Sequence, residues 1–139
     1  MQTFLPYADF DLSFACLDKK RLGNQVWREG LTLLGGGWKH HLASKMWRGH
    51  EYQLGMYCLA GVQECERRYE RDYGHIAAKI WQLMSPYSDT GLPKWFGDEA
   101  FHASHRSNLL RKLPDWYGQF GWTEGADLPY VWPKLGALA

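Results

Sequence analysis

The chain has 139 residues, of which 45% are hydrophobic and 22% are charged, and its formal net charge is +1. This length corresponds to one ordinary domain, which can bury a core without metal or disulfide staples. Because no apolar run approaches the roughly 18 residues of a membrane span and the start lacks the features of a signal peptide, we predict a cytoplasmic chain with a single domain over 1–139 and no membrane association.

The first predicted elements are an extended arm over 1–10 and a long helix over 11–34. Pro6 disfavours regular structure in the arm, and Asp11 can cap the helix that follows. Apolar side chains then recur at helical spacing. Gly23 interrupts this pattern and marks a point where the helix can kink, and the triple glycine at 35–37 ends it.

The middle of the chain is predicted to hold a loop and two further helices. The loop over 35–50 is basic and aromatic and contains a short helix at 41–47. A second long helix is predicted over 51–73, because its apolar side chains recur at three- and four-residue steps. Gly74 breaks this helix, and a shorter one follows over 75–84.

The last third of the chain is predicted to contain one more major helix and a tail. Glycines and prolines over 85–97 indicate a loop. The helix over 98–113 begins with acidic residues and ends with basic ones, as the helix dipole favours. Pro114 opens a short aromatic turn, and prolines predict an extended tail over 123–139. The whole pattern predicts an all-α protein, a single compact domain of three main helices with an extended N-terminal arm and an aromatic C-terminal tail.

Two stretches of the chain hold several cations and no acid. They cover 38–50 and 100–114, and the acids collect elsewhere. A nearly neutral protein with this distribution can present one positive face, although both stretches can equally be ordinary solvated surface. Aromatic residues make up 16% of the chain; most are expected in the core, and a few can serve as stacking groups for bases.

The cysteines and histidines form no recognisable metal site or disulfide framework. Cys16, Cys58 and Cys65 are odd in number and none lies in a Cys-x-x-Cys pair, which is typical of a reducing compartment. His102 and His105 can share a helix face, but a zinc site needs three or four ligands at recognisable spacing. We therefore expect neither a metal nor another cofactor.

Four stretches, in this order along the chain, resemble the pattern of one enzyme family. They are Leu17-Asp18-Lys19-Lys20-Arg21-Leu22, Gly49-His50-Glu51, Asp98-Glu99-Ala100 with Ser104-His105-Arg106, and Pro114-Asp115-Trp116-Tyr117. Their order and spacing resemble the pyrimidine-dimer DNA glycosylases of the endonuclease V type, which are small all-helical enzymes of about this size. The likeness spans most of the chain.

The resemblance implies a DNA-repair glycosylase that also cleaves abasic sites in duplex DNA. In this family the N-terminal α-amine attacks C1′ of the damaged nucleotide, and the resulting Schiff base permits β-elimination of the strand. An α-amine has a pKa of about 7.7–8.0, against about 10.4 for lysine, so much of it is unprotonated and nucleophilic near neutral pH. A carboxylate nearby stabilises the developing sugar cation and moves protons.

The nucleophile implied by the resemblance is the amine of Gln2 or of Met1. The family exposes a small residue by removal of the initiator methionine. Here Gln2 follows Met1, and methionine is usually retained before so large a side chain. Retention would move the amine outward by one residue, about 3.5 Å.

The acid implied by the resemblance is assigned to Glu29 or Asp18, with a slight preference for Glu29. The family places a glutamate beside the basic residues of the first helix. Glu29 lies eight residues after Arg21, near two helical turns, and Asp18 lies three residues before it, so both share its face. Either carboxylate can instead be a solvated partner of a neighbouring cation.

The remaining candidate residues are assigned to DNA binding. They are Lys20, Arg21, Gln25, Arg48, His50, His105, Arg106, Arg111 and Lys112. The last four would form a phosphate-binding strip on one helix, although a solvated cationic helix end would have the same composition. His50 can alternatively be a helix cap, and Trp116 and Tyr117 can be packing groups.

Double-stranded DNA is the predicted partner of a monomeric protein. Two rival functions stay open for the same scaffold, a non-catalytic DNA-binding module and different chemistry on a modified base. A module would show duplex affinity that falls steeply with salt, without strand cleavage. A third alternative is an interaction protein whose aromatic tail docks a partner.

Overall fold

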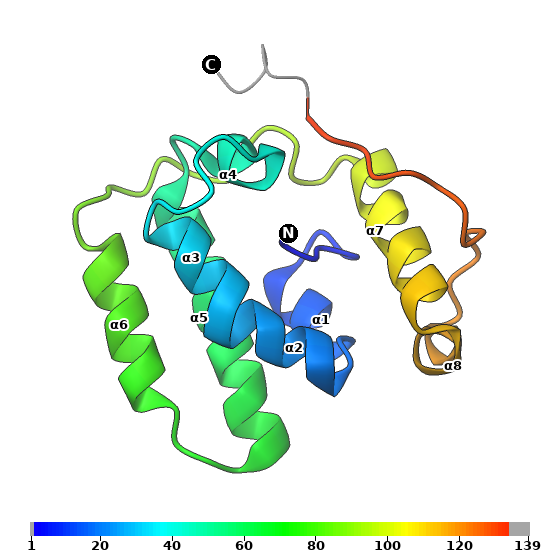
Figure 1. Cartoon of the computed structure of the whole chain (residues 1–139), viewed down its shortest axis with the longest axis horizontal. Coiled ribbons are helices and arrows are strands. Elements are labelled where there is room, and N and C mark those ends of the chain that lie inside the picture. Colours follow the sequence, from blue (N-terminus) through cyan, green and yellow to red (C-terminus); the bar gives the residue numbers. More distant parts are fainter. Residues whose placement is uncertain (1, 134–139) are drawn as a thin grey trace.

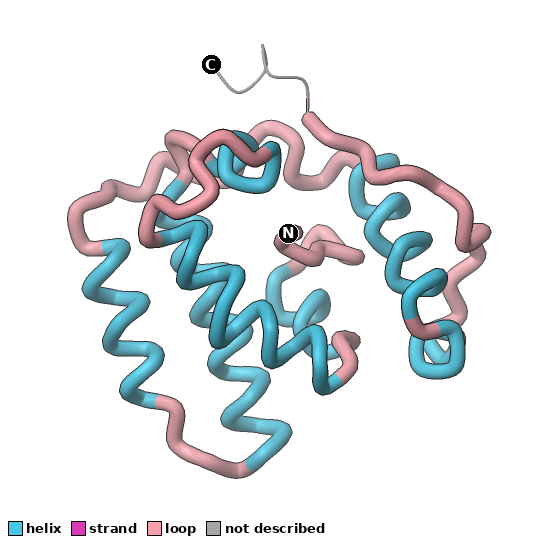
Figure 2. Tube along the Cα trace, viewed as in Figure 1, coloured by secondary structure: helices cyan, strands magenta, loops and turns pink. Residues whose placement is uncertain are grey.

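The computed structural model describes residues 2–133 and contains only helices and loops within that range (Figure 2). The all-α prediction is therefore confirmed. The helices are α1 (Phe10–Ala15), α2 (Lys19–Asn24), a π-helical turn (Gln25–Glu29), α3 (Gly30–Leu34), α4 (Leu42–Trp47), α5 (Glu51–Tyr69), α6 (Gly74–Met84), α7 (Glu99–Lys112), α8 (Pro114–Tyr117) and a 3₁₀ turn (Gly118–Phe120). None of these helices is long and apolar enough to cross a membrane.

Helix α5 is the central element of the larger half of the molecule. It packs against α1, α3, α6 and the π turn, and its middle turns are almost wholly buried. In Figure 1, α7 and α8 lie on the other side of the chain's first residues, so the N-terminal arm (residues 2–6) runs between the two groups of helices. The arm is buried along its whole length.

The N-terminal arm has no regular structure, as predicted, and helix α7 satisfies much of its backbone. The Leu5 amide donates to His105 Nδ1 over 2.9 Å, and the Leu5 carbonyl lies 2.7 Å from His102 Nδ1. The Arg106 guanidinium donates to the Pro6 carbonyl over 2.7 Å. Since buried backbone groups need partners, these polar side chains of α7 are what allow a strandless arm to be buried.

The predicted helix over 11–34 is wrong in its continuity. Helix α1 ends at Ala15, because the Arg68 side chain from α5 binds the carbonyls of Phe14, Ala15 and Leu17 and replaces further helical bonds. The N-cap of α1 is Asp9 rather than Asp11, with the Leu12 amide donating to Asp9 Oδ1 over 2.8 Å.

The second half of that predicted helix is continuous but does not kink at Gly23. That glycine lies inside α2, and the departure from α-helical geometry comes at the π turn over Gln25–Glu29. A π turn places the backbone hydrogen bond five residues apart instead of four, and such turns are frequent at functional sites.

The other predicted helices are confirmed, with shifts at their ends. Helix α5 stops at Tyr69, because Glu70 takes a left-handed conformation with φ of 52°, and Gly74 begins α6 instead of standing before it. Asp98 caps α7 through the Ala100 amide. The short helix in the basic loop, α4, lies within one residue of its predicted bounds.

The described part of the tail, up to residue 133, is extended and lies along α7. Side chains of α7 hold its backbone: Ser107 accepts from the Leu128 amide over 2.9 Å, and Ser104 accepts from the Val131 amide over 3.1 Å. The prediction of an extended tail is confirmed to this point, and its last six residues lie outside the described residues.

Candidate active site

The π turn brings Gln25 and Glu29 together on the side of the helix that faces the N-terminal arm. The Gln25 amide donates to Glu29 Oε2 over 2.6 Å and to the Gln2 carbonyl over 2.7 Å. One side chain therefore joins a carboxylate to the first described residue of the chain. Met1 lies outside the described residues.

Tyr57 of α5 fixes the orientation of the Gln25 amide. Its hydroxyl lies 2.8 Å from Gln25 Oε1 and 3.0 Å from the Phe4 carbonyl oxygen. Burial raises the pKa of Tyr57 well above its ordinary value, so the hydroxyl keeps its proton and donates it. With Oε1 accepting from Tyr57, the Gln25 nitrogen must face the two oxygens of Glu29 and Gln2.

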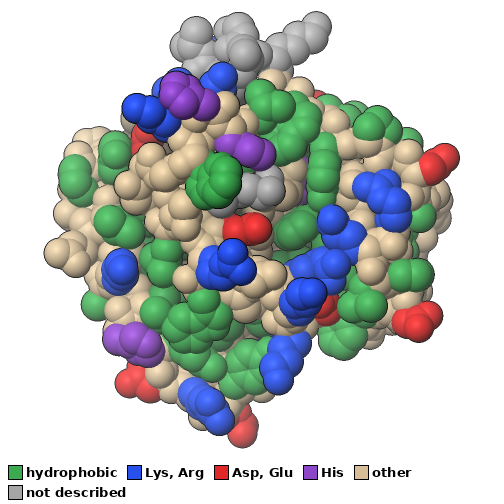
Figure 3. Space-filling model, viewed as in Figure 1, with side chains coloured by type: hydrophobic (Ala, Val, Ile, Leu, Met, Phe, Trp, Pro, Cys, Tyr) green, Lys and Arg blue, Asp and Glu red, His purple; other side chains and the backbone are tan. Residues whose placement is uncertain are grey.

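A small pocket of about 180 Å³ opens beside this network. Its lining combines one carboxylate with three cations and is formed by Phe4, Lys20, Arg21, Asn24, Gln25, Glu29 and Lys112. Figure 3 shows Lys and Arg side chains gathered on this face, in a band that runs from α2 toward α7. We call this hollow the Glu29 pocket. It offers an acid–base group within a rim that favours anions.

Asp18, the other predicted acid, lies in a different environment. It is buried, its Oδ1 accepts from the Tyr117 hydroxyl over 2.5 Å, and it pairs with Arg21 at 3.2 Å. The backbone amide of Asp18 also donates to the Tyr117 hydroxyl oxygen, over 3.1 Å. The structure thus places Asp18 at the junction of α2 with α8, and it is not among the residues that line the Glu29 pocket.

The structure buries two members of the predicted cationic strip on α7, His105 and Arg106. His105 is fully buried beneath Leu5, and burial lowers its pKa to about 3. Arg106 is buried too and binds Glu99, Glu124 and the Pro6 carbonyl. Both side chains are engaged inside the molecule because the arm and the tail, which are distant in sequence, pack on this face of α7.

The other two members of that strip are exposed. Arg111 donates to the Ala126 carbonyl over 3.2 Å, so it also holds the tail. Lys112 lines the Glu29 pocket, together with Lys20 and Arg21 from α2. The structure therefore brings three of the predicted DNA-binding cations to one place, from elements about 90 residues apart in the sequence.

Arg48 and His50 lie at the start of α5, away from the Glu29 pocket. The Arg48 guanidinium donates to the Lys39 carbonyl over 2.8 Å. His50 occupies the N-cap position of α5, but its side chain contacts the Gly91 carbonyl at 2.9 Å instead of capping the helix. DNA contact by these two residues stays a prediction.

Tyr57 and Phe4 are parts of the site that the sequence did not single out. Tyr57 falls on the apolar stripe of its helix, where it is interpreted as a core residue. The available signal was that a buried tyrosine hydroxyl requires a partner. The sequence offered no indication that this partner would be Gln25. Within residues 2–133, the structure holds no group of three His, Cys, Asp or Glu side chains placed to bind a metal ion.

Comparison with known proteins connects this region to one family. A family model described as pyrimidine dimer DNA glycosylase matches residues 1–77 of the 139-residue chain. No curated relative and no solved structure matches the chain. The matched residues contain the arm, the π turn and α5, and therefore every group of the Gln2–Gln25–Glu29–Tyr57 network.

Proposed function

The chain belongs to the pyrimidine dimer DNA glycosylase family, and from that premise we propose that it excises a damaged or modified pyrimidine from duplex DNA and then cleaves the abasic strand. The observation that carries the proposal is the Gln25 amide, which joins the Glu29 carboxylate to the Gln2 carbonyl at the start of the chain. This chemistry requires an N-terminal amine and a carboxylate close to each other, and the contact through Gln25 supports the proposal because it brings the first described residue near Glu29.

In the first step the N-terminal amine forms a bond to C1′ of the nucleotide. The C1′–N bond to the base breaks, its electron pair leaves with the base, and the base takes up a proton. Glu29 stabilises the cationic sugar through its charge and accepts the proton released by the amine. The amine belongs to Met1 if that residue is retained and to Gln2 if it is removed.

In the second step the sugar ring opens and an imine forms between C1′ and the amine nitrogen. Loss of a proton from C2′ then breaks the C3′–O bond to the phosphate, which cleaves the strand. Glu29 is the carboxylate nearest the arm in the hydrogen-bond network, so we assign it the proton transfers. Asp18 becomes a structural group, because its oxygen is already held by Tyr117.

The cations of the Glu29 pocket bind the DNA backbone in this proposal. Lys20, Arg21 and Lys112 surround the carboxylate, and their charges favour phosphates on either side of the lesion. Gln25 acts as a positioning residue instead of a DNA contact, since both of its amide hydrogens and its oxygen have partners inside the protein.

The test is a borohydride trap on duplex DNA that contains one cyclobutane pyrimidine dimer. Reduction should yield a covalent adduct on the N-terminal residue, and peptide mass spectrometry identifies whether this is Met1 or Gln2. Glu29→Gln should retain duplex affinity and lose excision by about 10²-fold or more. The exposed Glu70→Gln serves as the matched control and should cleave like the parent. Unchanged cleavage by Glu29→Gln would remove Glu29 from the mechanism.

The second candidate function is a DNA-binding module without catalysis, and the burial of Gln2 favours it. Gln2 is only 5% exposed, so an amine on this residue would be poorly accessible to a sugar. This function predicts salt-sensitive duplex binding with neither adduct nor cleavage. Cleavage of a duplex with a modified base, but not of the dimer substrate, would instead indicate the same scaffold with another substrate.

A further inference from the structure

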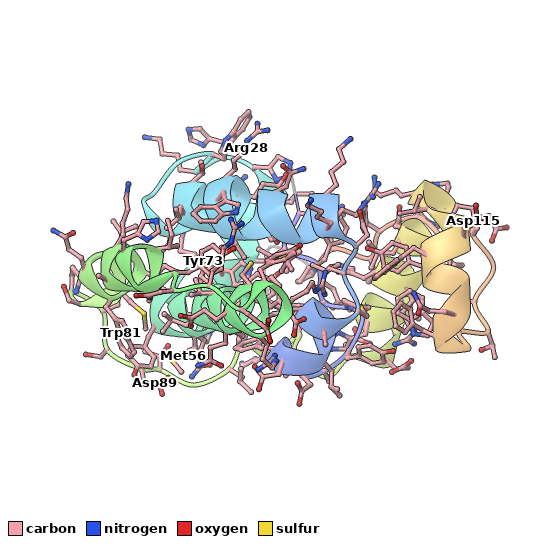
Figure 4. The ribbon with its side chains drawn as sticks, turned by 90° about the horizontal axis from the view of Figure 1, so that it is seen from below. Arg28, Met56, Tyr73, Trp81, Asp89 and Asp115 are labelled. Atoms are coloured by element: carbon pink, nitrogen blue, oxygen red, sulfur yellow. The ribbon has the colours of Figure 1, made fainter. Side chains whose placement is uncertain are left out.

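A long groove lies on the face of the molecule opposite the Glu29 pocket. Figure 4 shows Met56, Trp81 and Asp89 on one side of the molecule and Arg28, which belongs to the π turn that contains Gln25 and Glu29, on the other. The groove has a volume of about 640 Å³ and is lined by residues of α1, α5 and α6 and by the loop after α6. We call it the α5 groove. It takes no part in the chemistry proposed above.

The floor of the α5 groove is one stripe of helix α5. It extends from Tyr52 through Met56 and Ala60 to Glu66, a stretch of 15 residues and about 21 Å of helix. Helix α1 forms one wall and helix α6 the other, through Phe10 on the first and Trp81 on the second. A trough between two helices, about four turns long, has the dimensions of a site that receives a third helix.

The apolar surface of this groove is only partly covered. Trp81 is 49% exposed, and Phe10, Tyr52, Met56 and Ala77 are partly exposed. An exposed indole beside a flexible methionine is the kind of anchor surface that protein interfaces use. Single exposed apolar residues need no explanation, but here several share one concave surface.

The rim of the groove is acidic. Asp9, Asp11, Glu66 and Asp89 all line it, and the described lining residues include no Lys, Arg or His. This is the opposite of the Glu29 pocket, where three cations surround one carboxylate. Four carboxylates repel phosphates and attract cations, so the groove is unsuited to DNA and complementary to a basic segment.

We propose that the α5 groove binds a cationic amphipathic helix of a partner protein. The helix would place its apolar stripe against Met56 and Trp81 and its lysine or arginine side chains toward the acidic rim. Apolar contact along the floor would supply affinity, and the carboxylates would select a basic partner and set its orientation. DNA and partner would then occupy opposite faces at the same time.

The experiment uses a designed 15-residue peptide labelled with fluorescein. It carries leucines at i, i+4, i+7 and i+11 and lysines beside this stripe, and a second peptide replaces each lysine with glutamate. Fluorescence anisotropy of the full chain should show binding of the lysine peptide that weakens with salt, and at least tenfold weaker binding of the glutamate peptide.

Two substitutions locate the binding surface. Trp81→Ala should weaken binding of the lysine peptide at least tenfold, whereas Trp38→Ala, at another exposed tryptophan that lies outside the groove, should leave it unchanged. Asp11→Lys should weaken binding severalfold and reduce its salt dependence, and Asp115→Lys, on the exposed start of α8, should not. Melting temperatures confirm that each variant is folded. Trp81→Ala and Asp11→Lys test the groove separately, so if one of them does not fold, the other still decides the proposal.

Three outcomes of the peptide assay would overturn the proposal. They are equal binding of both peptides, binding unaffected by both Trp81→Ala and Asp11→Lys, and absence of binding by the lysine peptide. Sedimentation of the chain as a dimer that Trp81→Ala dissociates would also overturn it, because the occupant would then be a second copy. The assay contains no DNA, so its failure is distinct from failure of the proposed glycosylase activity.

Discussion

Gln25 connects three parts of the chain through one planar amide. Its nitrogen donates to Glu29 and to the Gln2 carbonyl, and its oxygen accepts from Tyr57. The sequence suggested Glu29 as the acid through its spacing from Arg21 and did not pair it with Gln25. Sequence-based reasoning assigned Gln25 to DNA instead, because the buried tyrosine that orients it comes from a different helix.

Tyr57→Phe should destabilise the protein and reduce its activity together. The change leaves the buried Gln25 Oε1 without its donor, which costs about 1–3 kcal/mol, and frees the amide that holds Glu29. Urea denaturation measures the first effect, and the rate of cleavage of dimer-containing duplex measures the second. Tyr87→Phe, at a tyrosine that is 43% exposed, is the control. Equal stability of the two variants would show that the Tyr57 hydroxyl is not important to the network.

At the scale of the helices, the sequence predicted elements well and their interruptions poorly. Apolar spacing located α5, whose middle turns are buried, and the acidic start and basic end of α7 located that helix, although most of its buried side chains are polar. Apolar spacing could not locate the end of α1, since the group that binds its last carbonyls is Arg68, more than fifty residues away. The π turn was equally inaccessible, because five residues of ordinary helical composition carry no signal of the altered hydrogen bonds.

Gly61 of α5 allows two other elements to approach this helix closely. A Cβ at this position would lie 2.8 Å from a Phe14 ring carbon of α1 and 2.9 Å from a Val26 methyl of the π turn. Gly61→Ala should therefore destabilise the protein by about 1–3 kcal/mol through overpacking, measured as a shift in the urea midpoint. At Gly118, no described atom would lie within 4 Å of the added carbon, so Gly118→Ala should have little effect. A stable Gly61→Ala would mean that α1 can move away from α5 at low cost.

Across the whole molecule, burial of the arm has brought neutral histidines into the core. His105 has a pKa lowered to about 3 by burial, and burial lowers the pKa of His102 as well. Composition indicated a cationic surface here, since a sequence shows charge but not which backbone will cover it. Only the assembled fold reveals that α7 turns these side chains toward residues 2–6.

Stability should fall as the pH is lowered below about 6.5. The unfolded chain binds a proton at His105 near the ordinary pKa of 6.5, and the folded chain resists it until about pH 3. Each pH unit in this window lowers the free energy of unfolding by up to about 1.4 kcal/mol through this one histidine. His105→Gln keeps an acceptor for the Leu5 amide and cannot be protonated, so its unfolding free energy should change less between pH 6.5 and 5. His40→Gln, at an exposed histidine, should behave like the parent. If the unfolding free energy of His105→Gln falls with pH as steeply as that of the parent, His105 does not control the acid response.

The cations of the Glu29 pocket should make duplex binding depend on salt concentration, and cations elsewhere should not. Lys112 lies in the Glu29 pocket, whereas Lys79 lies on α6, outside the pocket lining. Lys112→Ala should weaken duplex binding and reduce the slope of log K against log salt by about one, as determined by anisotropy titrations at several salt concentrations. Lys79→Ala should leave the slope unchanged, and equal slopes in the two variants would place the DNA elsewhere.

The π turn also sets the phase of the helix that contains it. A π turn is equivalent to one residue inserted into an α-helix, and each residue of an α-helix rotates the chain by about 100°. Deleting one residue between Gln25 and Glu29 would restore the α-helix and rotate everything after it relative to α2. Either Glu29 would turn away from the arm, or Leu33 and Leu34, now buried, would turn toward solvent. The position of the carboxylate and the packing of α3 therefore depend on the same residue count, so the segment tolerates substitutions far better than changes in length.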